Sequence, residues 1–197
     1  MGEDVGSFGH RATDVVRLSQ QIELAAGGLV EHDSGGLDRI HRLGFDVEHR
    51  RALLFGGCHV AAVMAATDFV VPAVEIIDSR YRDFKFDLKS VVADNTSASR
   101  FVVGGRAVDA RSVDLRTTGL VLEKNGVPVA LGAGAAVLGH PAAAVAMLVN
   151  HLGRRGKALP AGSLVLSGGA TEAVAVQKGD HVTLRVQGMG SVSVRFV

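Results

Sequence analysis

The chain has 197 residues, of which 47% are hydrophobic and 21% charged, and its formal net charge at pH 7 is +1. This length suits one domain with a substantial core, and the high apolar fraction with a small net charge excludes a disordered chain. The balanced charge offers no electrostatic surface to nucleic acid. A single cysteine can form neither an internal disulfide nor a zinc site of paired cysteines, so we expect a cytoplasmic protein.

The segment up to about Gly57 gives few consistent signals. Val15, Leu18 and Ile22 follow a helix-like spacing, which favours a helix there. Farther along, paired glycines, histidines and arginines interrupt every apolar run, and we expect no defined element in residues 27–56.

From Cys58 onward the local patterns agree with one another. Residues 59–67 carry apolar side chains at helical spacing, and the β-branched run 69–77 predicts a buried strand. Residues 94–97 favour turns and caps, and they precede a short expected strand at 101–103.

The clearest unit is a β-hairpin. Two apolar runs, residues 119–124 and 127–131, flank Asn125-Gly126, and this dipeptide supplies both positive-φ positions of a type I′ turn. Pro128 has no N–H to donate, so the second strand should lie at a sheet edge or at a bulge.

An uncharged stretch, residues 130–149, is long enough to span a membrane. Gly139 breaks it, and Pro141 suits the first turn of a helix that His140 caps and Gly153 ends. We therefore expect a strand, a turn and a helix here, and no membrane as a partner.

Three further strands are expected in the C-terminal part, at residues 163–166, 181–187 and 191–197. In the last of them, Ser193 and Arg195 alternate with apolar residues, as in a half-buried strand. The elements add up to a β-rich α+β domain with few helices.

A candidate site lies near the end of the expected strand 69–77. Glu75 is a carboxylate inside an apolar run, where it needs a metal, a cation or hydrogen-bond donors. The structural alternative is an ion pair that holds a loop, between Glu75 and Arg80 or a lysine. A lone carboxylate is also a poor metal site, because a hard divalent cation takes several oxygen ligands.

Two other clusters of polar residues invite a functional and a structural interpretation. Lys85 with the hydroxyls of Ser97 and Ser99 would suit an anionic substrate, or a solvated strand edge and a helix cap. The run Ser167-Gly168-Gly169 offers backbone N–H groups to a carboxylate, although a plain turn is the commoner case.

Several motifs between Gly57 and Val197 occur together. They are Val70-Val-Pro-Ala-Val-Glu-Ile-Ile-Asp-Ser-Arg-Tyr81, Asp83-Phe-Lys-Phe-Asp-Leu88, Val91-Val-Ala-Asp-Asn95, Val113-Asp-Leu-Arg-Thr-Thr-Gly119, Glu123-Lys-Asn-Gly126, Gly132-Ala-Gly-Ala-Ala-Val-Leu-Gly-His-Pro141 and Gly188-Met-Gly-Ser-Val-Ser-Val194. In combination they resemble the hydratase/decarboxylase branch of the fumarylacetoacetate hydrolase superfamily. Within the branch, the Ser79-Arg-Tyr and Phe84-Lys-Phe-Asp versions and Ser167-Gly-Gly are more similar to decarboxylating than to hydrating members.

The resemblance implies a mixed β-roll or sandwich of the fumarylacetoacetate hydrolase C-terminal-domain type. It also implies a lyase of meta-cleavage aromatic catabolism that uses Mg²⁺ or Mn²⁺ to convert 4-oxalocrotonate (2-oxohex-3-enedioate) to 2-oxopent-4-enoate and CO₂. If the 1-carboxylate and 2-oxo group chelate the metal, it stabilises the dienolate that CO₂ leaves behind. Hydration of 2-oxopent-4-enoate, through the same chelate, is the alternative.

The resemblance assigns site residues by motif position. Glu75 matches a metal-binding glutamate, and Asp78 and Lys85 match positions near the site where we expect catalytic roles. The residues expected to bind substrate are Asn95, Ser97, Ser167 and Gly168.

The sequence departs from the family pattern before residue 57. Family members have two further metal glutamates and an active-site lysine there; Asp46 and Glu48 have the glutamates' spacing without the surrounding motif, and no lysine precedes Lys85. All prolines and lysines follow residue 70. We therefore expect residues 1–56 to be an atypical N-terminal segment, read in a shifted frame or poorly ordered. Residues 57–197 would then be an incomplete catalytic core with impaired activity.

The resemblance also implies partners. The substrate would be a small 2-oxo dicarboxylate, and the chain would form a homo-oligomer or a hetero-complex with 2-oxopent-4-enoate hydratase. A chain without activity of its own would be a non-catalytic subunit of such a complex.

Overall fold

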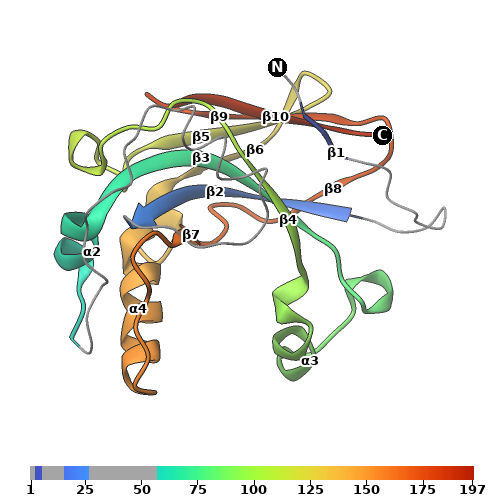
Figure 1. Cartoon of the computed structure of the whole chain (residues 1–197). Helices are drawn as coiled ribbons and strands as arrows, with labels where there is room; N and C mark the ends of the chain where they lie inside the picture. Colours follow the sequence, from blue (N-terminus) through green and yellow to red (C-terminus); the bar gives the residue numbers. More distant parts are fainter. Residues whose placement is uncertain (1–2, 6–15, 27–56) are drawn as a thin grey trace.

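Two five-stranded β-sheets carry the fold, and helices lie at their ends (Figure 1). The structure is a computed structural model that describes residues 3–5, 16–26 and 57–197. Its strands are β1 (Glu3–Val5), β2 (Val16–Ala26), β3 (Thr67–Ile77), β4 (Ala98–Val103), β5 (Gly119–Lys124), β6 (Val127–Ala133), β7 (Leu164–Leu166), β8 (Val174–Val176), β9 (His181–Val186) and β10 (Gly190–Phe196). Its helices are α2 (Val60–Ala66), α3 (Leu88–Ala93) and α4 (Pro141–Gly153), with short 3₁₀ helices η1 (Arg82–Phe84), η2 (Asn95–Ser97), η3 (Ala110–Ser112) and η4 (Gly134–Ala136).

The first sheet has the strand order β1-β10-β9-β5-β6. Its β5–β6 hairpin is the expected one, because Asn125 and Gly126 have φ values of 53° and 82°. β6 is an edge strand, and the β5–β6 register shifts between Leu122 and Glu123, where Glu123 pairs with Pro128. The missing N–H of Pro128 thus accounts for both the edge position and the irregularity.

The second sheet has the order β4-β3-β2-β7, and β8 also pairs with β2. β2 runs antiparallel to β3 from the pair Arg17–Ile77 to the pair Ala26–Thr67. The helix favoured by the spacing of Leu18 and Ile22 is therefore wrong. Long-range pairing with β3 outweighs a local apolar period, since propensity is a weak prior that tertiary context overrides.

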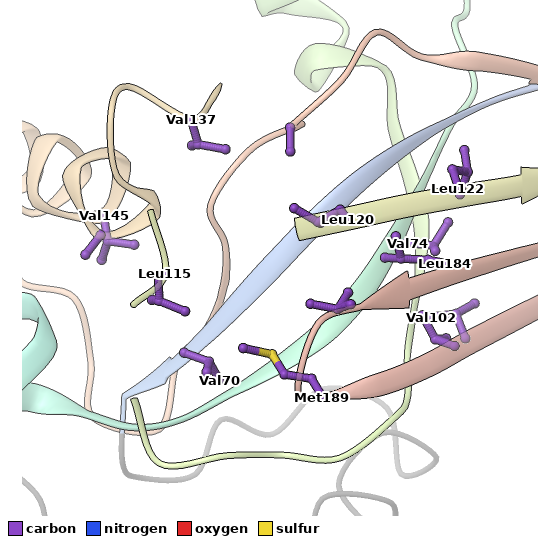
Figure 2. Close-up of a cluster of buried hydrophobic side chains, with 14 of the residues drawn as sticks. Val70, Val74, Val102, Leu115, Leu120, Leu122, Val137, Val145, Leu184 and Met189 are labelled. Carbon is purple, nitrogen blue, oxygen red and sulfur yellow. The ribbon is translucent and has the colours of Figure 1, made fainter. Parts of the chain in front are cut away.

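The main core fills the space between the two sheets. Alternate β3 residues Val70, Val74 and Ile76 belong to it, together with Leu122 of β5 and Leu184 of β9 (Figure 2). The intervening β3 residues belong to a second, smaller cluster on the opposite face of the strand. Its members are Phe69, Val71, Ala73, Val103 and Ala107, with Leu164 packed against them.

The uncharged stretch forms the end of β6, the 3₁₀ helix η4 and the core helix α4. Residues Gly134–Gly153 have the length and the mean hydropathy, 1.4, of a membrane span. α4 itself is 13 residues long, or about 20 Å, and is shorter than a bilayer core. It buries Val145 and Val149 in the main core. The expected strand, turn and helix are confirmed, and His140 is the N-cap.

The helix end differs slightly from the expectation. Gly153 is the last residue of α4, Arg154 is the C-cap in right-handed conformation, and the positive-φ glycine comes later, at Gly156. The elements α3, β1 and β8 were not expected. All three are short, and α3 leaves Leu88 and Val92 exposed, so it lacks the apolar pattern of a core helix.

Candidate functional site

Glu75 lies on the face of β3 that is turned away from the main core. Side chains alternate along a strand, so Glu75 shares a face with Phe69, Val71 and Ala73 of the smaller cluster. It pairs with Ser19 of β2 and with Phe101 of β4, and it is half-buried. The expected strand with a carboxylate inside an apolar run is confirmed.

The chain leaves β3 in a turn that lies against η2. Asp78 donates its backbone N–H to the carbonyl oxygen of Ser97 at 2.8 Å, and Ile77 pairs with Ala98. The end of β3 and η2 are therefore neighbours in space. Together they carry four of the expected site residues: Glu75, Asp78, Asn95 and Ser97.

Buried Asp94 forms hydrogen bonds both to the turn that follows β3 and to η2. Its carboxylate accepts the backbone N–H of Arg80 at 3.2 Å and the hydroxyls of Ser97 at 3.1 Å and Ser79 at 3.4 Å. The Arg80 guanidinium donates to the Asp94 carboxylate and to its carbonyl oxygen. Burial alone would raise the pKa of Asp94, but these donors outweigh it and hold the pKa below its usual value.

The η2 turn itself has an unusual backbone. Asn95, Thr96 and Ser97 have φ values of 51°, 54° and 59°, so three successive non-glycine residues are left-handed. Such residues cost roughly 1–2 kcal/mol each, and β-branched Thr96 is the least suited of them. The hydrogen bonds of Asp94 and Asp78 to this turn offset part of that cost.

Ser97 and Asn95 differ in what they offer a ligand. The Ser97 side chain is 1% exposed and its only proton goes to Asp94, which favours a structural role for its hydroxyl. Asn95 is exposed. Ser99, on β4, is exposed as well, which agrees with the solvated strand edge of the structural interpretation.

Lys85 lies beyond the turn on an exposed segment. It is the C-cap of η1, and its backbone N–H donates to the carbonyl oxygen of Arg82 at 3.1 Å. Phe86 next to it packs edge-on against Tyr81, with ring centroids 6.0 Å apart.

The Ser167-Gly168 pair follows β7 on the other side of β2. β7 pairs with residues 23–25 of β2 and β8 with residues 16–18, so the connection between them runs beside the middle of β2. Ser167 is buried, and a methyl group added at Gly168 would lie 3.7 Å from Val137 of the main core. Ser167 and Gly168 are thus two strands away from Glu75.

The described residues do not fit a divalent metal ion by themselves. Within residues 57–197, no three His, Cys, Asp or Glu side chains gather in a group that could hold one. Mg²⁺ demands near-octahedral oxygen ligands, and Glu75 offers one carboxylate. Asp46 and Glu48 lie outside the described residues.

The comparisons with known proteins agree on the family. Residues 43–197 match the family model "Fumarylacetoacetate (FAA) hydrolase C-terminal". A 4-oxalocrotonate decarboxylase of Pseudomonas putida is 61% identical over 141 residues, which are 72% of this chain and 53% of that protein. A 2-hydroxyhexa-2,4-dienoate hydratase of Comamonas testosteroni is 43% identical over 134 residues, 68% of this chain and 51% of that protein.

A solved structure extends the match. The 4-oxalocrotonate decarboxylase from Pseudomonas putida G7, complexed with magnesium and adipate, superposes with a TM-score of 0.78 at 47% identity and covers 93% of this chain and 61% of that one. The chain spans about half the length of the curated relatives it matches. The described strands, the few helices and the family model together show that this chain belongs to the fumarylacetoacetate hydrolase family, through its C-terminal domain.

Proposed function

We propose that the chain carries part of a cytoplasmic, metal-dependent lyase that decarboxylates 4-oxalocrotonate to 2-oxopent-4-enoate and CO₂. The observation that supports this most is the difference in identity, 61% to the decarboxylase against 43% to the hydratase over stretches of similar length. The adipate bound by the related solved decarboxylase is a six-carbon dicarboxylate, like the proposed substrate.

The proposed roles follow the chemistry of each side chain. Glu75 would give one oxygen ligand to Mg²⁺ or Mn²⁺. Asp78, just after the end of the same strand, would have a catalytic role. Exposed Lys85 and Asn95 are donors suited to the carboxylates of a dianion. The backbone N–H groups of Ser167 and Gly168, which lie on the far side of β2 from Glu75, would suit a carboxylate of the substrate.

A chimera tests the proposed reaction. The part of the P. putida decarboxylase that precedes its match would be joined to Gly57 of this chain, which supplies the upstream motifs that residues 1–56 lack. We expect CO₂ release from 4-oxalocrotonate that depends on added Mg²⁺ and is lost in the Glu75→Gln chimera. A folded chimera that releases no CO₂ would refute the proposal.

The same chimera decides between decarboxylase and hydratase. Hydration consumes 2-oxopent-4-enoate in its enol form and releases no CO₂, so each substrate is offered separately. Consumption of the pentenoate alone would assign the chain to the hydratase, in keeping with its 43% identical relative.

We also propose that residues 1–56 are an atypical segment in front of an incomplete core. The resemblance in motifs begins at about Gly57, and lysine and proline appear only after residue 70. Translating the upstream DNA in the other two frames tests the shifted-frame explanation. In the family, a Glu-x-Glu motif carries the two further metal glutamates and a Gly-Leu-Lys segment carries the active-site lysine. Absence of both motifs from the two other frames would rule the explanation out.

Association with a hydratase is the proposed partnership. Co-expression of the full chain with a tagged 2-oxopent-4-enoate hydratase would show it as co-purification in a fixed ratio. If the complex forms while added metal leaves the melting temperature of this chain unchanged, the chain acts as a non-catalytic subunit.

A further inference from the structure

We propose that Asn125 is a site of spontaneous deamidation. The folded chain keeps it unreactive, and it reacts when the contact between the β5–β6 turn and the start of β9 opens. The inference does not depend on the proposed reaction. Asn125-Gly126 is the only Asn-Gly pair in the sequence. Asparagine is a thermolabile residue, and a following glycine has no Cβ to obstruct attack by its own nitrogen.

The modification converts the side-chain amide to an acid, with water as the co-reactant. The backbone nitrogen of Gly126 attacks Cγ of Asn125, and the amide nitrogen leaves as ammonia with the proton of the attacking nitrogen, so that a succinimide ring forms. Water then adds to either carbonyl and opens the ring. The products are aspartate and isoaspartate, and in isoaspartate the main chain runs through the side-chain carbons.

The fold holds Asn125 through both its backbone and its side chain. Its N–H donates to the carbonyl oxygen of His181 at 2.8 Å, and its Oδ1 accepts the N–H of His181 at 2.9 Å. Its Nδ2 donates to Oδ1 of Asp180 at 2.8 Å. Both polar atoms of the amide are thus bonded to residues 180–181, and Cγ cannot turn toward the Gly126 nitrogen while these bonds persist.

Asp180 is the fixed side of this contact. Its side chain is 8% exposed, and its Oδ2 accepts the N–H of Gln177 at 2.9 Å and lies 3.9 Å from Nζ of Lys124. Its carbonyl oxygen accepts the N–H of Phe196 at 2.9 Å. Asn125 and Gly126 are exposed, so water reaches the turn. The hydrogen bonds to residues 180–181, and not burial, therefore protect Asn125.

The product cannot remake the contact. A carboxylate at position 125 would face the Asp180 carboxylate where an amide nitrogen now donates at 2.8 Å, and two carboxylates so close disfavour ionisation of both. The single ammonium of Lys124 cannot neutralise two charges. Because ammonia is lost, the change is also irreversible. The fraction of modified chains would therefore record how often the turn has opened.

Deamidation rates of the folded and the urea-unfolded chain, followed by peptide mapping with detection of isoaspartate, test the protection. We expect folded wild type to react at least roughly tenfold more slowly, because an opening that costs about 1.4 kcal/mol leaves roughly one chain in ten open. Equal rates at the same pH and temperature would overturn the proposal, and this comparison needs no variant.

Asp180→Ala tests which contact protects the turn. It removes the acceptor of the Asn125 amide and should bring the folded rate close to the unfolded one. Val145→Ala in α4 is the matched control, because it lowers the free energy of unfolding through the core without touching the turn. If folded Asp180→Ala reacts no faster than Val145→Ala, the proposal is overturned.

An exchange of amide and carboxylate tests why the product cannot return. Asn125→Asp carries the charge of the product and should lower the melting temperature. Combined with Asp180→Asn, the new amide can donate to the carboxylate at position 125 while its oxygen still accepts the N–H of Gln177, so most of the loss should be recovered. The single Asp180→Asn variant completes the cycle. A double variant no more stable than Asn125→Asp would contradict the repulsion on which irreversible opening depends.

Discussion

His140 shows how one side chain couples a helix to pH. Its Nδ1 accepts the N–H of Ala142 at 3.0 Å and so caps α4, and only the neutral imidazole has that lone pair. Burial lowers the pKa of His140; nearby Asp114 opposes the shift and Arg116 adds to it. The cap therefore persists to a lower pH than a free histidine would allow.

This lowered pKa predicts how stability depends on pH. Between the folded pKa and the ordinary value of 6.5, the unfolded state binds more protons, so stability present above 6.5 is lost as pH falls through this window. His140→Asn keeps a capping oxygen that does not titrate, and it should flatten the slope. Chemical denaturation at about pH 7.5 and pH 5.5 measures it. Exposed His151→Asn is the control, and an unaltered slope in His140→Asn would contradict the cap linkage.

Single residues differ in how far the sequence reveals their role. The cap of His140 and the edge position of Pro128 could be predicted, because each depends on its own backbone neighbours. The Arg80–Asp94 pair could not, since its partners are 14 residues apart and become neighbours only when η2 lies against the end of β3. The need for glycine at position 134 could not be predicted either. It arises from the close approach of Leu115, whose carbonyl oxygen would lie 1.7 Å from a methyl group added at Gly134.

At the scale of elements, the hairpin and β2 give opposite lessons. The β5–β6 hairpin is determined locally by its Asn125-Gly126 turn, and its type and position were predictable. β2 is determined by β3, which lies about fifty residues farther along the chain, and its own spacing suggested a helix. β3 has the same distant partner, but its β-branched run indicated a strand, so the mistake at β2 came from an apolar spacing that suits a helix.

The hairpin turn makes a stability prediction. Gly126 has a φ of 82°, so Gly126→Ala should lower the free energy of unfolding by about 1 kcal/mol. Gly119→Ala in the same hairpin is the matched control, because its added methyl lies 3.6 Å from Gln187 Oε1, an ordinary contact. Urea denaturation of both variants measures the difference. Equal stability of the two would show that the turn conformation contributes nothing.

At the scale of the whole molecule, the family and the sheet architecture were predictable, and the expected incompleteness of the site stays a prediction. The motifs from Gly57 onward indicate the fumarylacetoacetate hydrolase family, and the family model and the G7 decarboxylase structure confirm it. The roles of Glu75, Asp78 and Lys85 stay predictions, because they depend on ligands contributed from elsewhere. Among residues 57–197, Glu75 is the one acidic residue that the motifs assign to a metal.

CO₂ release from 4-oxalocrotonate by the purified 197-residue chain, with Mg²⁺ or Mn²⁺ supplied, measures most directly whether this core is complete. We expect little or none, because the resemblance places the other metal carboxylates and the lysine before Gly57, where this sequence lacks their motifs. The chimera, assayed beside it, should release CO₂. Metal-dependent release by the chain itself, abolished in Glu75→Gln, would contradict an incomplete core.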